Sequence, residues 1–133
     1  MINAESPIKE IMTAEVFTVS PDDRLLKANN IFDEKGFHHL LVLEDNTLVG
    51  ILSKTDLLDY LWNALAVGNN IKSTDIRIKD LMTPNPISID CDDTVGLAAD
   101  IFLSNKLHAL PVLDGEDLVG VITSYDLLKY TFK

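Results

Sequence analysis

Two short stretches of the sequence carry the same polar pair, in which a hydroxyl residue is followed three positions later by an acid. The pairs are Ser53 with Asp56 and Thr123 with Asp126, and each lies between apolar runs. This spacing is typical of a helix N-terminus, where the hydroxyl accepts from a free amide and the acid reaches back to the cap residue. A strand that leads directly into a helix also directs free N–H groups outward. Each pair can therefore cap a helix or receive a polar ligand.

The two pairs belong to a longer internal repeat. Residues 8–60 align without a gap with residues 78–130, so that His38 falls on His108. Apolar positions match along the alignment, the paired acids at 22–23 fall on those at 92–93, and Gly50 falls on Gly120. Matching over an entire unit is typical of internal duplication. We assign residues 8–68 to the first repeat, 69–77 to a polar linker and 78–132 to the second repeat.

The composition favours a globular protein that is built from both repeats. The chain has 133 residues, of which 47% are hydrophobic and 24% are charged. One repeat alone would bury only about 60% of its unfolded surface, so the two together make a more adequate core. The net charge of −10 opposes non-specific binding to nucleic acid or to an anionic membrane.

The cysteine count and the lengths of the apolar runs exclude several further classes of protein. The single cysteine, Cys91, allows no intrachain disulfide and no cysteine-rich metal site. No apolar stretch approaches the roughly 20 residues that a membrane-spanning helix needs. Residues 1–7 have neither the basic start nor the apolar core of a signal peptide. We therefore expect a cytoplasmic protein without a membrane partner.

Hydrophobic periodicity predicts the order β-α-β-β-α in each repeat. We expect helices to begin at the acid-rich stretches 20–23 and 90–93, where negative charge is favoured by the helix dipole. Gly36 is expected to end the first of these helices. The predicted hairpin strands are residues 40–43 with 47–52, and 109–113 with 118–122.

Several motifs, in the same order in both repeats, are typical of one family. Met12-Thr13 and Met82-Thr83 open the repeats, and residues 50–56 and 120–126 close them. The second repeat also carries Ala-Leu-Pro-Val-Leu-Asp at residues 109–114. With these motifs the chain resembles a tandem pair of cystathionine-β-synthase (CBS) domains, also known as a Bateman module. The resemblance implies an α+β fold, a mixed α/β sandwich in which the repeats pack face to face with pseudo-two-fold symmetry.

The resemblance also implies a ligand. Modules similar to this one bind adenine nucleotides or related adenosyl compounds in two clefts, where the acid of each closing motif holds the ribose hydroxyls. A carboxylate accepts from two neighbouring hydroxyls at once, which suits a ribose. Carried over to this chain, one cleft would be formed by Ser53, Asp56, Thr83, Leu107, His108, Ala109 and Pro111. The other would be formed by Thr123, Asp126, Thr13, Phe37, His38 and His39.

The function implied by the resemblance is that of a regulatory module and not of an enzyme. The expected ligand is AMP, ADP, ATP or S-adenosylmethionine, and no cofactor is required. Ligand binding would change the arrangement of the repeats or of a homodimer, and so signal in trans to a still unidentified protein effector. The expected dimer faces are the helix at residues 55–67, which carries Trp62, and the helix at 127–130. The alternative is a ligand-free dimerisation or protein-interaction module, in which the motif acids are helix caps alone.

The other polar residues have simpler explanations than catalysis. His38, His39 and His108 could suggest a metal, but the sequence lacks the cysteine cluster or ordered carboxylate–histidine spacing of a zinc site. We expect these histidines to line the clefts. The acids beside Cys91 give no reason for a reactive thiolate. We therefore predict no catalytic residue and no metal ligand.

Overall fold

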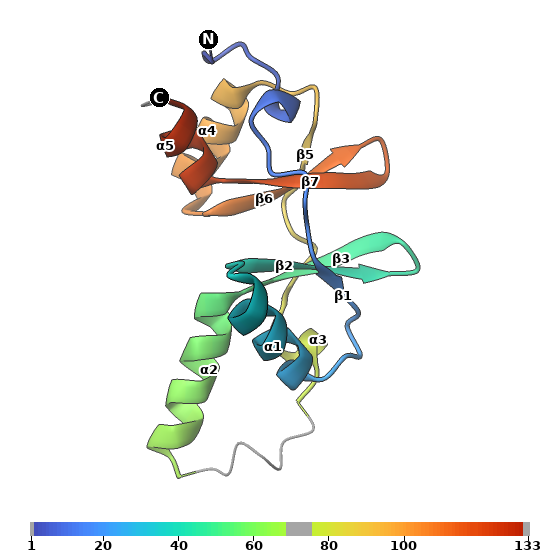
Figure 1. Ribbon diagram of the computed structural model, residues 1–133, viewed down its shortest axis with the longest axis vertical. Coiled ribbons are helices and arrows are strands. Elements are labelled where there is room, and N and C mark those ends of the chain that lie inside the picture. The colour runs from blue at the N-terminus through green and yellow to red at the C-terminus, as the bar shows by residue number, and fades with distance from the viewer. Residues whose placement is uncertain (1, 69–75, 132–133) are drawn as a thin grey trace. The chain divides into compact units, whose positions relative to one another are not determined.

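The computed structural model describes residues 2–68 and 76–131. The chain divides into two compact units (Figure 1). The central unit consists of residues 17–85, and the terminal unit combines residues 1–16 with residues 86–133. Each unit therefore contains most of one sequence repeat together with the opening segment of the other. No helix in the described ranges is long and apolar enough to cross a membrane.

The central unit is a four-stranded sheet with helices packed on it. The sheet has the strand order β1-β2-β3-β4, in which β1 runs parallel to β2 and the other neighbours are antiparallel. Apolar residues of α1, β2, β3, α2 and α3 share one core. The elements are β1 (Thr18–Val19), α1 (Leu25–Lys35), β2 (His39–Glu44), β3 (Thr47–Ser53), α2 (Lys54–Ala66), α3 (Ile78–Leu81) and β4 (Thr83–Pro84).

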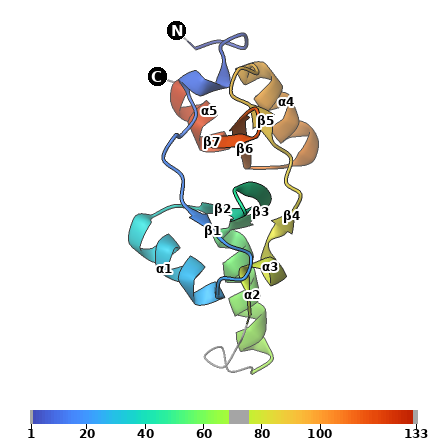
Figure 2. The ribbon, with the colours of Figure 1, turned by 90° about the vertical axis from the view of Figure 1, so that its right-hand side faces the viewer.

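The terminal unit has a three-stranded sheet in the order β5-β6-β7, with β5 parallel to β6 and β7 antiparallel to β6. Helices α4 and α5 pack against one another (Figures 1 and 2). The short 3-10 helix η1 adds apolar residues to this core. The elements are η1 (Ile8–Glu10), β5 (Ile89–Asp90), α4 (Val95–Asn105), β6 (Ala109–Asp114), β7 (Asp117–Thr123) and α5 (Ser124–Thr131).

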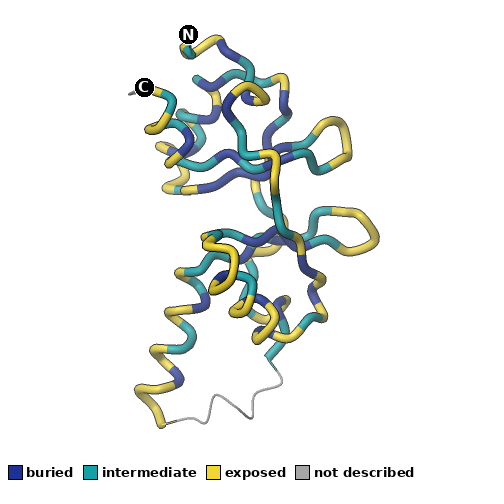
Figure 3. Tube along the Cα trace, viewed as in Figure 1, coloured by how far each residue is buried: buried dark blue, intermediate teal, exposed yellow. Residues whose placement is uncertain are grey.

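The order β-α-β-β-α is present in both units, which confirms the mixed α/β fold class predicted from the sequence. Equivalent positions are buried in the two first helices: Ala28 and Phe32 in α1, and Ala98 and Phe102 in α4. Their spacing produces the apolar stripe of a helix that lies on a core. In Figure 3 the hairpin turns and the strand ends beside them are exposed, and the rest of both hairpins is buried or half-buried.

Part of the predicted linker belongs to the central unit. The amide of Leu25, the first residue of α1, donates to the carbonyl oxygen of Ile76 at 3.0 Å. Arg24 and Arg77 form an antiparallel bridge beside this bond. Residues 69–75, the rest of the predicted linker, lie outside the described residues.

The predicted starts of the first helices, at residues 20–23 and 90–93, are wrong. Helix α1 begins at Leu25 and α4 at Val95, and neither has an acid in its first turn. The predicted end of α1 is confirmed, because Gly36 adopts the left-handed conformation with φ 70° and its amide donates to the last turn.

The acids of these stretches close a turn in front of each helix. Asp23 Oδ2 accepts from the amide of Ser20 at 2.8 Å, and Asp93 Oδ2 accepts from the amide of Asp90 at 3.0 Å. The hydrogen bond from Ser20 holds the pKa of Asp23 below its ordinary value. A short polar side chain that bonds its own backbone in this way competes with helix formation. The local bond therefore delays the helix by several residues.

The opening segment of each repeat pairs with the second hairpin strand of the unit that contains it. In the terminal unit, Thr13 forms an antiparallel bridge with Val121 of β7, with hydrogen bonds of 2.9 Å in both directions. In the central unit, Thr83 of β4 pairs in the same way with Ile51 of β3. Both units therefore complete their sheets with a Met-Thr segment.

A glycine in each of these strands permits the close approach of the segment. A Cβ atom at Gly120 would lie 2.8 Å from the carbonyl oxygen of Thr13, closer than a real Cβ contact. A Cβ atom at Gly50 would collide with the side chain of Met82, and it would lie 3.2 Å from the carbonyl oxygen of Thr83. Glycine is used where another backbone approaches this closely.

We predict that Gly120→Ala destabilises the protein more than Gly50→Ala. At Gly120 the obstructing atom belongs to a hydrogen-bonded backbone, so the segment must shift, at a cost of about 1–3 kcal/mol. At Gly50 the nearest atoms belong to the flexible Met82 side chain, and we expect a loss below about 1 kcal/mol. Urea denaturation of the two variants measures the difference. Equal losses would contradict this account of the two glycines.

Candidate functional site

The pair Ser53 and Asp56 forms a complete capping box at the start of α2. Ser53 Oγ accepts from the amide of Asp56 at 3.0 Å, and Asp56 Oδ2 accepts from the amide of Ser53 at 3.1 Å. The amide of Lys54, the first residue of the helix, donates to the carbonyl oxygen of His38 at 2.8 Å. The end of β3, the start of α2 and the residues before β2 are thus joined around one half-buried carboxylate.

The pair Thr123 and Asp126 forms the same arrangement at the start of α5. Thr123 Oγ1 accepts from the amide of Asp126 at 3.1 Å, and Asp126 Oδ2 accepts from the amide of Thr123 at 2.9 Å. Asp126 is buried, with 6% of its surface exposed, and it also accepts from the hydroxyl of Thr13 at 3.2 Å. The amide of Ser124 donates to the carbonyl oxygen of His108 at 2.9 Å. The capping role foreseen for both pairs is therefore present.

The structure distributes the other predicted site residues over the two units. In the central unit, Thr83 pairs with Ile51, which lies two residues before Ser53 in β3. Phe37 and His38 directly precede β2, and His39 is the first residue of that strand. In the terminal unit Thr13 contacts Asp126, and Leu107 and His108 precede β6, which contains Ala109 and Pro111. The strand pairing places His39 opposite Ser53 and Ala109 opposite Thr123. The assignment of residues from both units to one cleft stays a prediction.

An aromatic pair beside the Ser53 motif was not foreseen. The rings of Phe17 and Phe37 lie 4.9 Å apart at an interplanar angle of 51°, and the ammonium group of Lys35 lies 5.7 Å from the centre of the Phe17 ring. Sequence reasoning placed Phe37 but not Phe17 among the site residues, although both lie just before a strand. The pairing depends on the parallel alignment of β1 with β2, which local patterns do not specify.

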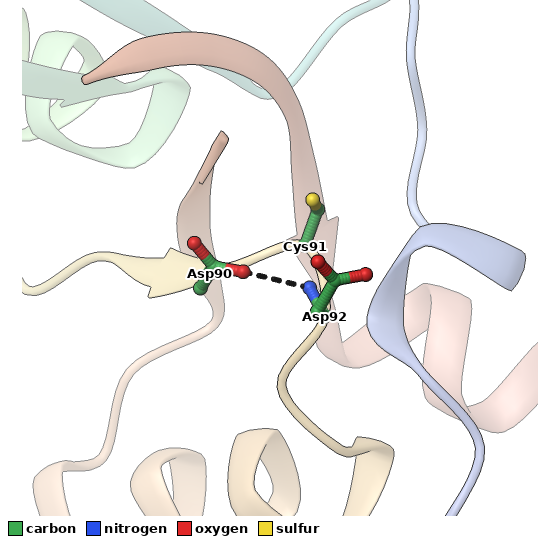
Figure 4. A group of neighbouring side chains, drawn as sticks. All are labelled: Asp90, Cys91 and Asp92. Atoms are coloured by element: carbon green, nitrogen blue, oxygen red, sulfur yellow. Dashed lines mark hydrogen bonds between the residues drawn. The ribbon is translucent and has the colours of Figure 1, made fainter. Parts of the chain in front are cut away.

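The acids around Cys91 could suggest a metal site, and Figure 4 shows their arrangement. Ligand atoms of Asp90, Cys91 and Asp92 lie within 4.8 Å of one another. However, Asp92 pairs with Lys9 at 2.9 Å, and Asp90 Oδ1 accepts from the amide of Asp92 at 2.9 Å. Burial raises the pKa of the Cys91 thiol, and the neighbouring acids raise it further. The cluster is explained by a turn, a surface ion pair and a buried thiol.

Comparison with known proteins identifies the family. The CBS domain family matches residues 8–63 and again residues 78–133. The chain belongs to the CBS domain family. It carries two CBS repeats, as the resemblance of the sequence motifs predicted.

Three proteins illustrate the similarity. The protein MJ1225 of Methanocaldococcus jannaschii is 30% identical over 97% of this chain and 48% of its own length, and its crystal structure superposes with a TM-score of 0.82. The crystal structure of CBSX2 in complex with AMP is similar over 95% of this chain and 96% of that chain, with 30% identity and a TM-score of 0.77. The inosine-5′-monophosphate dehydrogenase of M. jannaschii is 29% identical over 96% of this chain but only 24% of its own length. The chain thus spans half or less of two of these relatives.

The hydrogen bonds predict that Asp126 stabilises the fold more than Asp56 does. Asp126→Ala should lower the free energy of unfolding by about 2 kcal/mol, because it removes a cap and also leaves the half-buried Thr13 hydroxyl without its acceptor. Asp56→Ala removes the cap alone and should cost about 1 kcal/mol. Chemical denaturation measures both losses.

The matched control for these two variants is Asp59→Ala, which changes an exposed acid within α2. It should change the free energy of unfolding by less than about 0.5 kcal/mol. An Asp126→Ala variant as stable as Asp59→Ala would contradict the hydrogen bonds described above.

Proposed function

We propose that this CBS pair is a regulatory module that binds an adenine nucleotide or a related adenosyl ligand, and that it is not an enzyme. The observation that carries the proposal is the half-buried carboxylate of Asp56, held at the start of α2 with one oxygen not engaged by the described residues. The proposal is supported by CBSX2, which is similar over nearly the whole of this chain and whose structure is a complex with AMP.

The chemistry of an adenosine ligand suits these residues. Asp56 Oδ2 accepts from the amide of Ser53, which leaves Oδ1 able to accept from a ribose hydroxyl. A hydrogen bond to a carboxylate is stronger than one between neutral groups. Lys54 begins the same helix, and a cation beside the positive end of a helix dipole favours a phosphate group. One short segment can thus contact both ends of a ribose phosphate.

Regulation would follow from a difference in affinity between two arrangements of the protein. A ligand shifts an equilibrium only by as much as it binds one state better than another. In this proposal the ligand favours one arrangement of the repeats or of a homodimer. A separate protein effector then binds one of the two arrangements better than the other, so the signal acts in trans.

The proposal predicts saturable binding of at least one of AMP, ADP, ATP and S-adenosylmethionine. Isothermal titration calorimetry measures the dissociation constant of each compound. A ligand present at about 100 times its dissociation constant should stabilise the protein by about 2.7 kcal/mol and raise the thermal midpoint by several degrees. Binding of none of the four, with no thermal shift, would overturn the proposal.

A second candidate function is a ligand-free interaction module. It is favoured by the completeness of the caps at Ser53 and Thr123, which already give each motif acid a structural role. It is also favoured by the exposed apolar side chains on α2, because a contiguous apolar stripe on a surface helix often marks a partner. Under this function the loss of a motif acid changes stability and no affinity.

The stripe on α2 supports the proposed homodimer under either function. Leu58, Trp62 and Leu65 are 55%, 72% and 61% exposed, and their spacing places them on one face of the helix. On α5, Tyr125 and Leu128 are 68% and 58% exposed. We propose that a second copy of the chain covers these faces, which are the helices expected from the sequence.

The dimer proposal predicts that Leu65→Lys shifts the protein to a monomer, because an ammonium group would be buried in an apolar interface. The matched control is Leu26→Lys on α1, where the leucine is similarly exposed at 65% but lies outside the proposed faces. Light scattering at micromolar concentration measures the mass of each variant. A monomeric native protein, or a dimer that both changes leave intact, would contradict the proposal.

A further inference from the structure

The two motif acids share one sequence pattern but differ in their hydrogen bonds. Asp126 accepts from the amide of Thr123 at 2.9 Å, from the Thr123 hydroxyl at 3.1 Å and from the Thr13 hydroxyl at 3.2 Å. Asp56 accepts from the amide of Ser53 at 3.1 Å and from no other group among the described residues. The acid of the central unit therefore keeps acceptor capacity that the acid of the terminal unit has already used.

The difference originates in two hydroxyl groups. Thr13 and Thr83 hold the same position in the repeat, since Thr13 pairs with Val121 and Thr83 with the equivalent Ile51. The Thr13 hydroxyl is directed to Asp126, within 3.5 Å of both carboxylate oxygens, whereas Thr83 is exposed and makes no such bond in the described part of the central unit.

The cap residues add to this difference. The Thr123 hydroxyl accepts from the amide of Asp126 and also donates to its carboxylate, so it takes up a second acceptor position there. Among the described residues, the Ser53 hydroxyl accepts from the amide of Asp56 and makes no further hydrogen bond. The two acids also differ in burial, because Asp126 is buried with 6% of its surface exposed and Asp56 is only half-buried.

The first residue of each helix differs as well. Helix α2 begins with Lys54 and α5 with Ser124, and both residues are half-buried. A phosphorylated ligand would gain a cation beside Asp56 and only a hydroxyl beside Asp126. Charge and free acceptor capacity therefore favour the same unit.

We propose that the two motifs take ligand in order, Asp56 first, and that the Thr13 hydroxyl occupies Asp126 as an internal competitor. This inference rests on the proposed function. The Thr13 hydroxyl competes with a ligand hydroxyl for this carboxylate, so a ligand must displace the Thr13–Asp126 hydrogen bond to take that acceptor position. A rotation of the Thr13 side chain breaks this bond while the Thr13 backbone stays paired with Val121. Binding at Asp126 is therefore weaker than binding at Asp56, and only binding at Asp126 displaces the Thr13 side chain.

The test is a calorimetric titration with AMP, and in parallel with S-adenosylmethionine, of the native protein and three variants. The native protein should show a tight and a weak class of site. Asp56→Asn should remove the tight class, and Asp126→Asn should remove the weak class. Thr13→Val removes the competing hydroxyl at nearly constant shape, and it should strengthen the weak class about tenfold, as expected for the loss of a hydrogen bond to a charged group.

Two controls separate the hydroxyl from other effects at the same positions. Thr13→Ser retains the hydroxyl and should give no gain in affinity, which also shows whether the lost methyl group matters. Thr83→Val makes the same change in the central unit, where the hydroxyl does not bond to the acid, and it should strengthen neither class.

The outcomes distinguish this inference from the function on which it rests. Binding to two classes of site that Thr13→Val leaves unchanged overturns the internal competitor. Equal affinities of the two classes of site would overturn the proposed order of binding. The loss of the tight class in Asp126→Asn would overturn it as well. The absence of binding by both probes, with no thermal shift in the native protein, overturns the proposed function and this inference with it.

Discussion

The structure depends on one reciprocal interaction, in which a hydroxyl residue and an acid cap a helix that begins directly at the end of a strand. At Ser53 and Asp56 the two hydrogen bonds fix the carboxylate where β3 becomes α2. The acid cannot rotate away without releasing the amide of the cap residue. Because the cap uses only part of the acceptor capacity of a carboxylate, the group that starts the helix remains available to a ligand.

The same capping interaction has different consequences in the two units, because among the described residues the Met-Thr segment beside it forms a hydrogen bond with the acid in only one of them. A glycine in β3 and another in β7 allow the Met-Thr segments to approach the strands closely. In the terminal unit this approach brings the hydroxyl of Thr13 to Asp126, although 113 positions separate the two residues. A duplicated sequence has thus produced one acid that is satisfied within the fold and one that is only partly satisfied.

Much of the fold could be predicted from the sequence, because its signals are local. The spacing of Ala28 and Phe32 specifies an inward helix face, and Gly36 marks the end of that helix. The helix starts were misplaced because Asp23 offers its carboxylate to the nearby amide of Ser20, a turn whose residue types resemble those of a cap. The family and its two repeats were predicted correctly from motif order.

The candidate site was predictable in its residue types but not in its asymmetry. Ser53 and Thr123 both fit the capping pattern, and the sequence does not show that one hydroxyl also donates to its acid. Nor does it show that Thr13 is directed to an acid while Thr83 is not, because that depends on side-chain rotation within a tertiary contact. Such differences arise from packing, which local patterns describe poorly.

The central claim is that a motif carboxylate recognises the ribose of an adenosine ligand. Its most direct test compares the affinity of the protein for AMP with that for 2′-deoxy-AMP by calorimetry, because the two ligands differ in a single hydroxyl. The account predicts that the deoxy compound binds at least about tenfold more weakly, and that Asp56→Asn reduces this discrimination. Equal affinity of the native protein for the two compounds would contradict it.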